Sequence, residues 1–207
     1  MADILEVTLL VVFLLGVFAV SNAVHSRGLP FFVSRKVAHV GAGLALLALP
    51  WLFVGPMWPV ALSLGFLLLL AATHRTNIWH GFARTGRVAE LAFAFSCFLS
   101  LLLLWGRDPW LAVVPPLFMA FGDAATGIVR FRVYKKEVKG WWGSLACLGV
   151  CSAIALLVQP LWVGLAGAVA FTVTEKLCGD VGVIHIDDNL AAPLAAMAVM
   201  EGLYALL

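Results

Sequence analysis

Eight apolar segments follow one another along the chain, with little polar sequence between them. They cover approximately residues 4–23, 37–54, 57–73, 89–105, 109–129, 143–159, 161–178 and 190–206. Most approach the roughly 20 residues that a helix needs to cross the hydrocarbon core of a bilayer. Only 12% of the 207 residues are charged, against about 25% in soluble domains. The sequence therefore predicts an all-α polytopic membrane protein, one integral membrane domain over residues 1–207 with about seven or eight transmembrane helices.

The positive charges alternate between the loops. They include Arg27, Arg35 and Lys36 in the first loop, Arg75, Arg84 and Arg87 in the third, and Arg130, Arg132, Lys135, Lys136 and Lys139 in the fifth. Because loops rich in Lys and Arg stay on the cytoplasmic side, we expect the odd-numbered loops to face the cytoplasm and both termini to be non-cytoplasmic. No basic stripe with interleaved aromatic residues suggests a nucleic-acid partner.

Most of the unusual polar residues fall at this predicted cytoplasmic face. They are Arg35, Lys36, His39, Asp123, Lys139, Ser144, Glu175, Asp188 and Asn189. Cytoplasmic loops simply holding the charges of a membrane protein would explain the arginines. That explanation suits Asp123 and Glu175 poorly, because a carboxylate at or inside the end of a membrane helix is costly and marks a functional site by default.

The first motif is Arg35-Lys36-Val37-Ala38-His39, at the start of the second apolar segment. Arg35 and His39 are four residues apart and share one helix face if the helix has begun by Arg35. Arg35 and Lys36 could contact phosphate or could only anchor the span to lipid headgroups. His39 lies one turn deeper, and its near-neutral pKa would suit proton transfer or phosphate contact.

The second motif is Gly122-Asp123, followed by Gly127 and Arg130. Asp123 could accept the proton of an alcohol or hold Mg²⁺, which uses one or two carboxylates together with substrate phosphates. Arg130 and Lys139 could then contact those phosphates. The alternative is a helix-packing carboxylate paired with a neighbouring arginine.

The third motif, Lys139-Gly140-Trp141-Trp142-Gly143-Ser144, opens the sixth apolar segment. Its glycines free the backbone and Ser144 can cap a helix. Cations and free N–H groups at a helix start suit phosphate. Trp141 and Trp142 are equally explained by an aromatic belt at the membrane surface.

The fourth motif joins Glu175, at the end of the seventh segment, to Asp187-Asp188-Asn189 at the start of the eighth. Carboxylates and an amide that close on one loop suit a hard metal ion or a nucleotide ribose. Asp187 to Asn189 could also be only a helix N-cap, where acidic residues are favoured.

In this order, the four motifs resemble the family of membrane lipid kinases that contains dolichol kinase, phytol kinase and CTP-dependent diacylglycerol kinase. The matching stretches are RKVAH (35–39), GDAATGIVR (122–130), KGWWGSLA (139–146) and TEKL…DDNLAAP (174–193). The family pattern usually has Ser and Glu where this chain has Gly140 and Trp142. The resemblance implies transfer of the γ-phosphate of CTP, or of a related nucleotide, to the hydroxyl of a lipid alcohol, with Mg²⁺.

The motifs and the resemblance together predict three sets of site residues. The catalytic set is Asp123 and His39; the nucleotide-binding set is Arg35, Lys36, Gly122, Arg130, Lys139, Gly143 and Ser144; the metal set is Asp123, Glu175, Asp188 and Asn189. A CTP-dependent cytidylyltransferase that makes a CDP-lipid is the main alternative, because it would use the same chemistry on a phosphate. A transporter is a further alternative, but it predicts polar residues along a whole span and at both faces.

Overall fold

The structure is a computed structural model that describes residues 2–83, 88–135, 139–181 and 184–207. Three residues of the basic loops, Arg84, Arg87 and Lys136, lie outside the described residues. Four helices form the first half of the chain: α1 (Ala2–Ser26), α2 (Phe31–Leu52), α3 (Met57–Thr73) and α4 (Ala89–Leu104). The second half contains α5 (Pro109–Leu117), η1 (Phe118–Gly122), α6 (Asp123–Val129), η2 (Arg130–Tyr134), α7 (Trp141–Ala155), α8 (Leu161–Leu177), β1 (Gly179–Val181), β2 (Ile184–Ile186) and α9 (Asp188–Tyr204).

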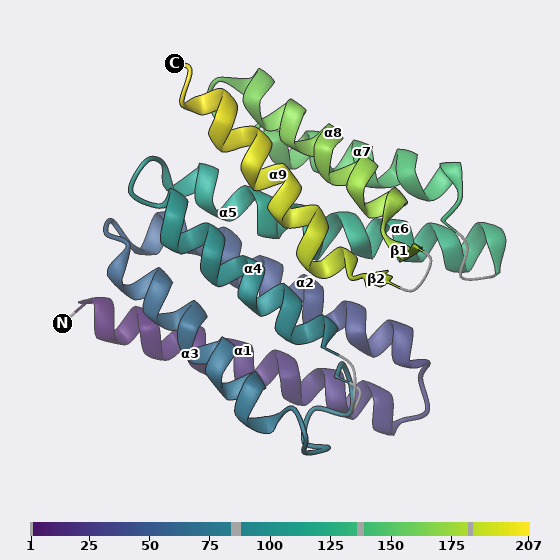
Figure 1. Cartoon of the computed structure of the whole chain (residues 1–207). Coiled ribbons are helices and arrows are strands. Elements are labelled where there is room, and N and C mark those ends of the chain that lie inside the picture. The colour runs from purple at the N-terminus through teal and green to yellow at the C-terminus, as the bar shows by residue number, and fades with distance from the viewer. Residues whose placement is uncertain (1, 84–87, 136–138, 182–183) are drawn as a thin grey trace.

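The described part of the chain is a helical bundle with one small interruption. Strands β1 and β2 pair antiparallel between α8 and α9, with Gly179 opposite Ile186. Apart from this hairpin of two three-residue strands, the described elements are helical, as predicted. The hairpin reverses the chain at the polar end of the bundle, so that the end of α8 and the start of α9 lie next to each other (Figure 1).

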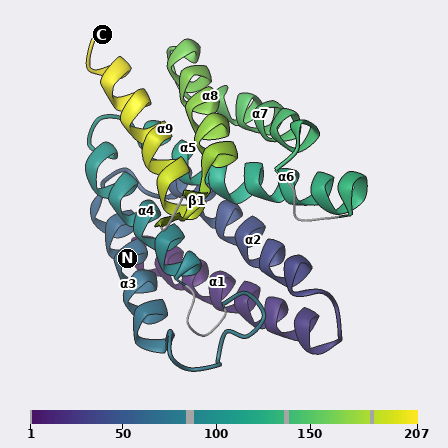
Figure 2. The same cartoon turned by 45° about the vertical axis from the view of Figure 1, so that its right-hand side comes forward.

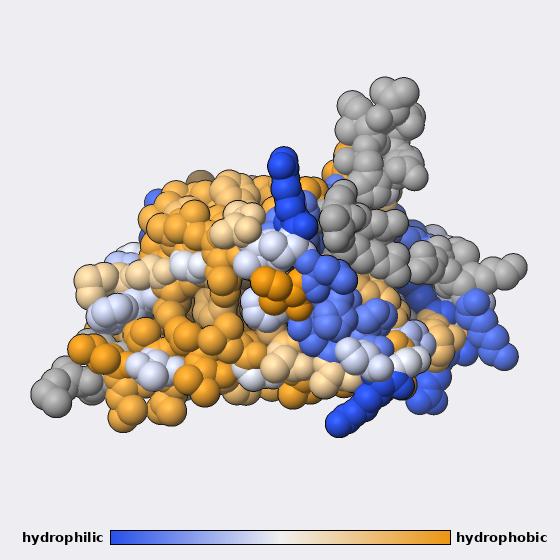
Figure 3. Space-filling model, turned by 90° about the horizontal axis from the view of Figure 1, so that it is seen from below, coloured by the Kyte–Doolittle hydropathy of each residue, from blue (hydrophilic) through white to orange (hydrophobic). Residues whose placement is uncertain are grey.

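Three helices are long and apolar enough to cross a membrane: Ile4–Ser26, Phe31–Leu52 and the continuous helix Pro109–Tyr134. Shorter apolar helices cover Met57–Thr73, Ala89–Leu104 and Trp141–Ala155. The prediction of a helical membrane protein is confirmed at this level, whereas the span count and the side of each loop stay predictions. Seen from below, the surface is largely hydrophobic, and hydrophilic residues gather toward one end (Figure 3).

The helices form two groups on either side of the continuous helix Pro109–Tyr134. Figure 2 shows α1 to α4 on one side and α7 to α9 on the other, with α5 and α6 between them. The continuous helix Pro109–Tyr134 is buried for most of its length, while α1 is mostly exposed. Both chain termini lie at one end of the bundle, and the β1–β2 hairpin and the end of η2 lie toward the other (Figure 1).

The central helix begins and bends for identifiable reasons. The Asp108 side chain caps α5 by accepting from the backbone N–H groups of Trp110 and Leu111, and Pro109 occupies the first turn, as the start of a helix favours. Pro116 lacks the N–H that would bond the carbonyl of Ala112. The Ser100 hydroxyl of α4 donates to that carbonyl instead, at 2.7 Å, so the buried acceptor stays satisfied.

Two π-helical segments follow in this helix, η1 immediately before Asp123 and η2 from Arg130 onward. Widened turns of this kind are frequent at functional sites. The helix continues to Tyr134, beyond the predicted end at residue 129. Asp123 therefore lies about three turns from the end of its helix.

Candidate functional site

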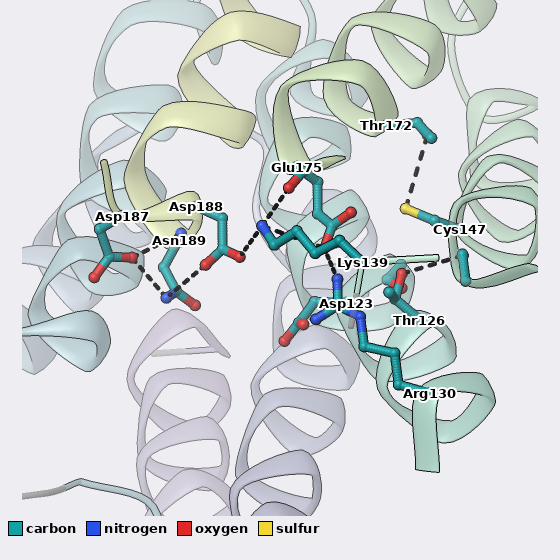
Figure 4. A network of polar contacts seen from close by, with 12 residues as sticks. Asp123, Thr126, Arg130, Lys139, Cys147, Thr172, Glu175, Asp187, Asp188 and Asn189 are labelled. Atoms are coloured by element: carbon teal, nitrogen blue, oxygen red, sulfur yellow. Dashed lines mark hydrogen bonds and ion pairs between the residues drawn. The ribbon is translucent and has the colours of Figure 1, made fainter. Parts of the chain in front are cut away.

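Two clusters of charged residues lie at the end of the bundle that carries the β1–β2 hairpin. The Asp123 cluster consists of Lys36 and His39 from α2 and Asp123 from α6. The Glu175 cluster consists of Arg130, Lys139, Glu175 and Asp188 (Figure 4). All seven residues belong to the predicted site. The structure thus brings together, in two groups, side chains that come from four separate stretches of the sequence.

In the Asp123 cluster, Lys36 donates a hydrogen bond from Nζ to Oδ2 of Asp123. His39 Nδ1 lies 3.5 Å from the same oxygen. The side chains of Lys36, Asp123 and His39 are only 13%, 12% and 7% exposed. The buried carboxylate of Asp123 thus lies between a lysine and an imidazole. Lys36 and His39 are three residues apart in α2 and share one face of that helix.

The charged residues of the first motif contact two different helices. Helix α2 begins at Phe31, so Arg35 and His39 are both helical. However, Arg35 extends to α9, where its Nη2 donates to Oδ1 of Asn189 at 3.1 Å, and Lys36 is the residue that reaches Asp123. The packing alternative for Asp123 supposed an arginine partner, and the structure shows a lysine.

Gly127 explains how α2 and α6 approach closely enough for this contact. A Cβ atom at Gly127 would lie 2.5 Å from the Phe32 ring and 2.8 Å from Cε of Lys36. Any larger residue would therefore displace the lysine that holds Asp123. Small residues allow such close helix approach in membrane proteins.

In the Glu175 cluster, a nearly fully buried carboxylate is surrounded by cations. Arg130 Nη2 lies 2.5 Å from Oε1 of Glu175, whose side chain is 1% exposed. Lys139 donates to the Glu175 backbone carbonyl, and its Nζ lies 3.8 Å from Oε1. The same Nζ lies 3.0 Å from Oδ2 of Asp188. Lys139 therefore links the end of α8 to the start of α9 (Figure 4).

The three polar residues at the start of α9 have two different roles. The Asp187 side chain accepts from the backbone N–H of Asn189 at 2.9 Å and is the helix N-cap. Asp188 and Asn189 instead face the site, through Lys139 and Arg35 respectively. The N-cap interpretation of this motif therefore holds for Asp187.

Several buried polar atoms in these clusters lack a hydrogen-bond partner among the described residues. They are His39 Nδ1, Arg130 Nε and Glu175 Oε2. Outside the clusters, His25 Nδ1 and Glu201 Oε2 are in the same situation. Leaving a buried polar group unsatisfied costs about 1–3 kcal/mol. In the two clusters, two nitrogens and one carboxylate oxygen therefore have hydrogen-bonding capacity that no described residue uses.

The predicted metal ligands do not form a ready metal cage. Among the described residues, no group of three or more His, Cys, Asp or Glu side chains is arranged to hold a metal ion. Asp123 is paired with Lys36, and Asp188 with Lys139. Glu175 Oε2 has no hydrogen-bond partner among the described residues. This oxygen fits Mg²⁺, which needs only one or two carboxylates when phosphate oxygens complete its coordination.

The predicted nucleotide-binding glycines lie at helix contacts. A Cβ at Gly143 would lie 3.2 Å from Cγ2 of Thr126, and the Thr126 hydroxyl bonds the carbonyl of Gly122 at 3.0 Å and that of Gly143 at 3.4 Å. Helix α7 begins at Trp141 with Gly140 as its N-cap residue, so the expectation that Ser144 caps it is wrong. Ser144 is instead buried in the first turns of the helix.

Sequence reasoning did not single out Glu90, which lies near the start of α4 and whose Oε1 is 3.2 Å from Nδ1 of His74. Thr126 was also missed, although it links α6 to α7. The available signal was the same as for Asp123: a polar residue within or at the edge of an apolar segment.

No family model matches this chain, and neither the curated proteins nor the solved structures include a match to it.

Proposed function

We propose that this protein is a membrane lipid-alcohol kinase that transfers the γ-phosphate of CTP, or of a related nucleotide, to the hydroxyl of a polyprenol or similar lipid alcohol. The observation that carries the proposal is the pair of buried charge clusters at one end of an apolar bundle. The Asp123 cluster has one polar atom, and the Glu175 cluster two, without a hydrogen-bond partner among the described residues. A lipid kinase needs this combination, because one substrate is apolar and the other is a polyanion.

The Asp123 cluster suits the acceptor alcohol. The hydroxyl oxygen forms a bond to the γ-phosphorus while the bond from that phosphorus to the β,γ-bridging oxygen breaks and CDP leaves. The hydroxyl proton passes to the Asp123 carboxylate or to the His39 imidazole, which lie 3.5 Å apart at their nearest polar atoms. Lys36 orients the carboxylate by its hydrogen bond.

The Glu175 cluster suits the nucleotide. Arg130 and Lys139 are cations that can exchange their present carboxylate partners for phosphate oxygens, with charge-assisted hydrogen bonds of similar strength. Phosphoryl transfer depends mainly on such positioning and charge neutralisation. Mg²⁺, held by Glu175 with Asp188 or Asp123, would supply further neutralisation of the phosphates when bound.

The membrane arrangement follows from the loop charges. We place the two clusters at the cytoplasmic face, where CTP is available, and both termini on the opposite side, with seven or eight spans in total. The acceptor then stays in the bilayer and presents its hydroxyl at the depth of the headgroups. This arrangement favours an enzyme over a transporter, because the predicted loops of the opposite face carry few charges.

Incubation of the purified protein with lipid alcohols and CTP labelled at either the γ- or the α-phosphate tests the proposal. Label from the γ-position in an organic-soluble monophosphate is the expected result. Label from the α-position in a lipid, with a lipid phosphate as substrate, would identify a cytidylyltransferase instead. Absence of both products across prenols, fatty alcohols and diacylglycerol, with CTP, UTP or ATP, would overturn the kinase proposal.

A further inference from the structure

An apolar cavity of about 120 Å³ lies between α1, α2, α3 and α4. Apolar side chains form nearly all of its wall, among them Leu10 and Phe18 of α1, Leu49 of α2 and Leu101 of α4. Protein interiors are otherwise packed with few voids larger than a water molecule. A cavity of this size therefore marks a place where the four helices leave room for an apolar ligand.

Among the polar residues of the cavity wall, Ser63 of α3 donates to the backbone carbonyl of Val60, whereas His39 and Glu90 lie toward one end of the helices. His39 and Glu90 both line the cavity, and both lie near the end of the bundle that carries the charged clusters. The His39 ring stacks on Phe93 of α4, with ring centroids 5.1 Å apart. Because His39 Nδ1 is also 3.5 Å from Asp123 Oδ2, this imidazole forms the boundary between the cavity and the Asp123 cluster.

The wall of the cavity extends along much of α2 and α4. Its wall runs from His39 to Leu49 on α2 and from Glu90 to Leu101 on α4, which is about 15 Å along each helix at 1.5 Å per residue. The hydrocarbon core of a bilayer is about 30 Å thick. The wall of the cavity therefore extends along these helices for about half of that thickness.

We propose that this α1–α4 cavity binds the hydrocarbon chain of the acceptor and that His39 receives its hydroxyl. The inference rests on the proposed function and adds the site and the shape of the substrate. A cavity of about 150 Å³ holds a molecule the size of benzene, so about 120 Å³ takes part of one hydrocarbon chain and has no room for a second. The acceptor is therefore a single-chain alcohol, isoprenoid or fatty, and not a diacylglycerol. His39 lines the cavity, and its Nδ1 atom, without a hydrogen-bond partner among the described residues, lies 3.5 Å from Oδ2 of Asp123.

A second apolar groove, on the outer side of α1, α2 and α6, is a weaker candidate. It is lined by Val12, Val33, Lys36 and Ile128, among others. Lys36 is its charged residue, and the Lys36 ammonium already bonds Asp123. The groove thus offers a lipid chain no open polar partner, whereas the cavity ends at His39.

Photo-crosslinking locates the chain without any need for catalysis. The probe is a fatty alcohol with a diazirine near the end of its chain, added to the purified protein in detergent without nucleotide. We expect labelled peptides to contain Leu10, Leu49 or Leu101, at the far end of the cavity. Labelling at Val12, Val33 or Ile128 instead would place the chain in the outer groove and overturn the proposal.

Filling the cavity tests the same inference through chain-length selectivity. Ala45 is buried and lines the cavity, so Ala45→Phe should exclude the end of a long chain. Each buried methylene that is lost lowers affinity roughly fourfold, so exclusion of three lowers it about 50-fold. Shorter alcohols should keep their turnover. Ala94→Leu, on the α4 wall, is a milder second variant should Ala45→Phe fail to fold.

The matched control is Ala71→Phe, which adds the same side chain at an exposed position of α3. It should leave the length profile unchanged. If γ-phosphate transfer is observed but Ala45→Phe and Ala94→Leu keep the wild-type profile, the cavity proposal fails and the kinase proposal stands. If the probe labels the cavity but no alcohol is phosphorylated, the kinase proposal fails and the lipid site stands.

Discussion

Replacement of Asp123 by Asn tests the role of the buried carboxylate most directly. The change keeps the shape of the side chain and removes its charge. In the structure, Lys36 donates to Asp123 Oδ2, and an Asn amide oxygen at the same place can still accept that bond. The variant therefore loses the charge of the acceptor and its capacity to take up a proton, while the contact between α2 and α6 remains.

Two magnitudes decide whether this experiment is interpretable. Removing one partner of a buried ion pair outright costs about 3–5 kcal/mol. Asp123→Asn keeps a neutral acceptor for Lys36, so we expect a smaller loss of stability, about 1–2 kcal/mol, which is the difference between a charge-assisted and a neutral hydrogen bond. Loss of a general base lowers the rate about 10²–10⁴-fold. As long as the variant stays mostly folded, a loss of stability of this size changes the rate little. A rate loss of about 10²-fold or more would therefore report on the chemistry of Asp123.

The assay combines thermal unfolding in detergent with the initial rate of γ-phosphate transfer. Asp187→Asn is the matched control, because Asp187 is a helix N-cap and Asn caps as well as Asp; both its stability and its rate should stay near those of the wild type. A changed Mg²⁺ requirement in Asp123→Asn would indicate a metal ligand, and an unchanged one a base. A stable Asp123→Asn protein with near-normal turnover would show that Asp123 is a packing residue.

Three further predictions follow from the same contacts. Lys139→Ala should weaken CTP binding and Glu175→Gln should reduce the response to Mg²⁺, both measured by titration; unchanged values in both variants would remove the Glu175 cluster from the nucleotide site. Gly127→Val should destabilise the protein by about 1–3 kcal/mol through overpacking against α2, and an unchanged thermal midpoint would contradict the close approach of α2 and α6. Cysteines introduced at Ala2 and Leu207 should react with an impermeant maleimide in intact cells, above a low background because the native cysteines are buried; labelling only after permeabilisation would invert the orientation.

The helices were largely predictable from the sequence because apolar segments of this length have few alternatives in a membrane. The positions at which the helices begin and end were less predictable. The second segment was expected to begin at residue 37, and α2 begins at Phe31. The apolar segment begins only after Arg35 and Lys36, because these residues are charged. The helix includes both of them, because Arg and Lys are good helix formers.

The pairing of side chains between helices was the part that the sequence could not supply. Arg35 and Lys36 are neighbours on α2, about 100° apart around the helix axis. Which of them reaches Asp123 depends on how α2 is rotated against α6. In the structure, Phe32 and Lys36 are the residues of α2 that pack against Gly127. The same limit applies to Glu175, whose arginine partner lies 45 residues away in the chain.

The energetic cost of the two clusters is itself an argument for function. A buried ion pair often contributes no more to stability than well-packed apolar residues of similar volume. The pairs Lys36–Asp123 and Arg130–Glu175 therefore add little stability that leucine-rich contacts could not supply. His39 Nδ1 and Glu175 Oε2, moreover, lack hydrogen-bond partners among the described residues, a cost that packing does not require. Selection for stability alone would remove such groups from an apolar bundle. Their presence at one end, beside a cavity that ends at His39, is explained if a phosphate donor and an apolar alcohol meet there.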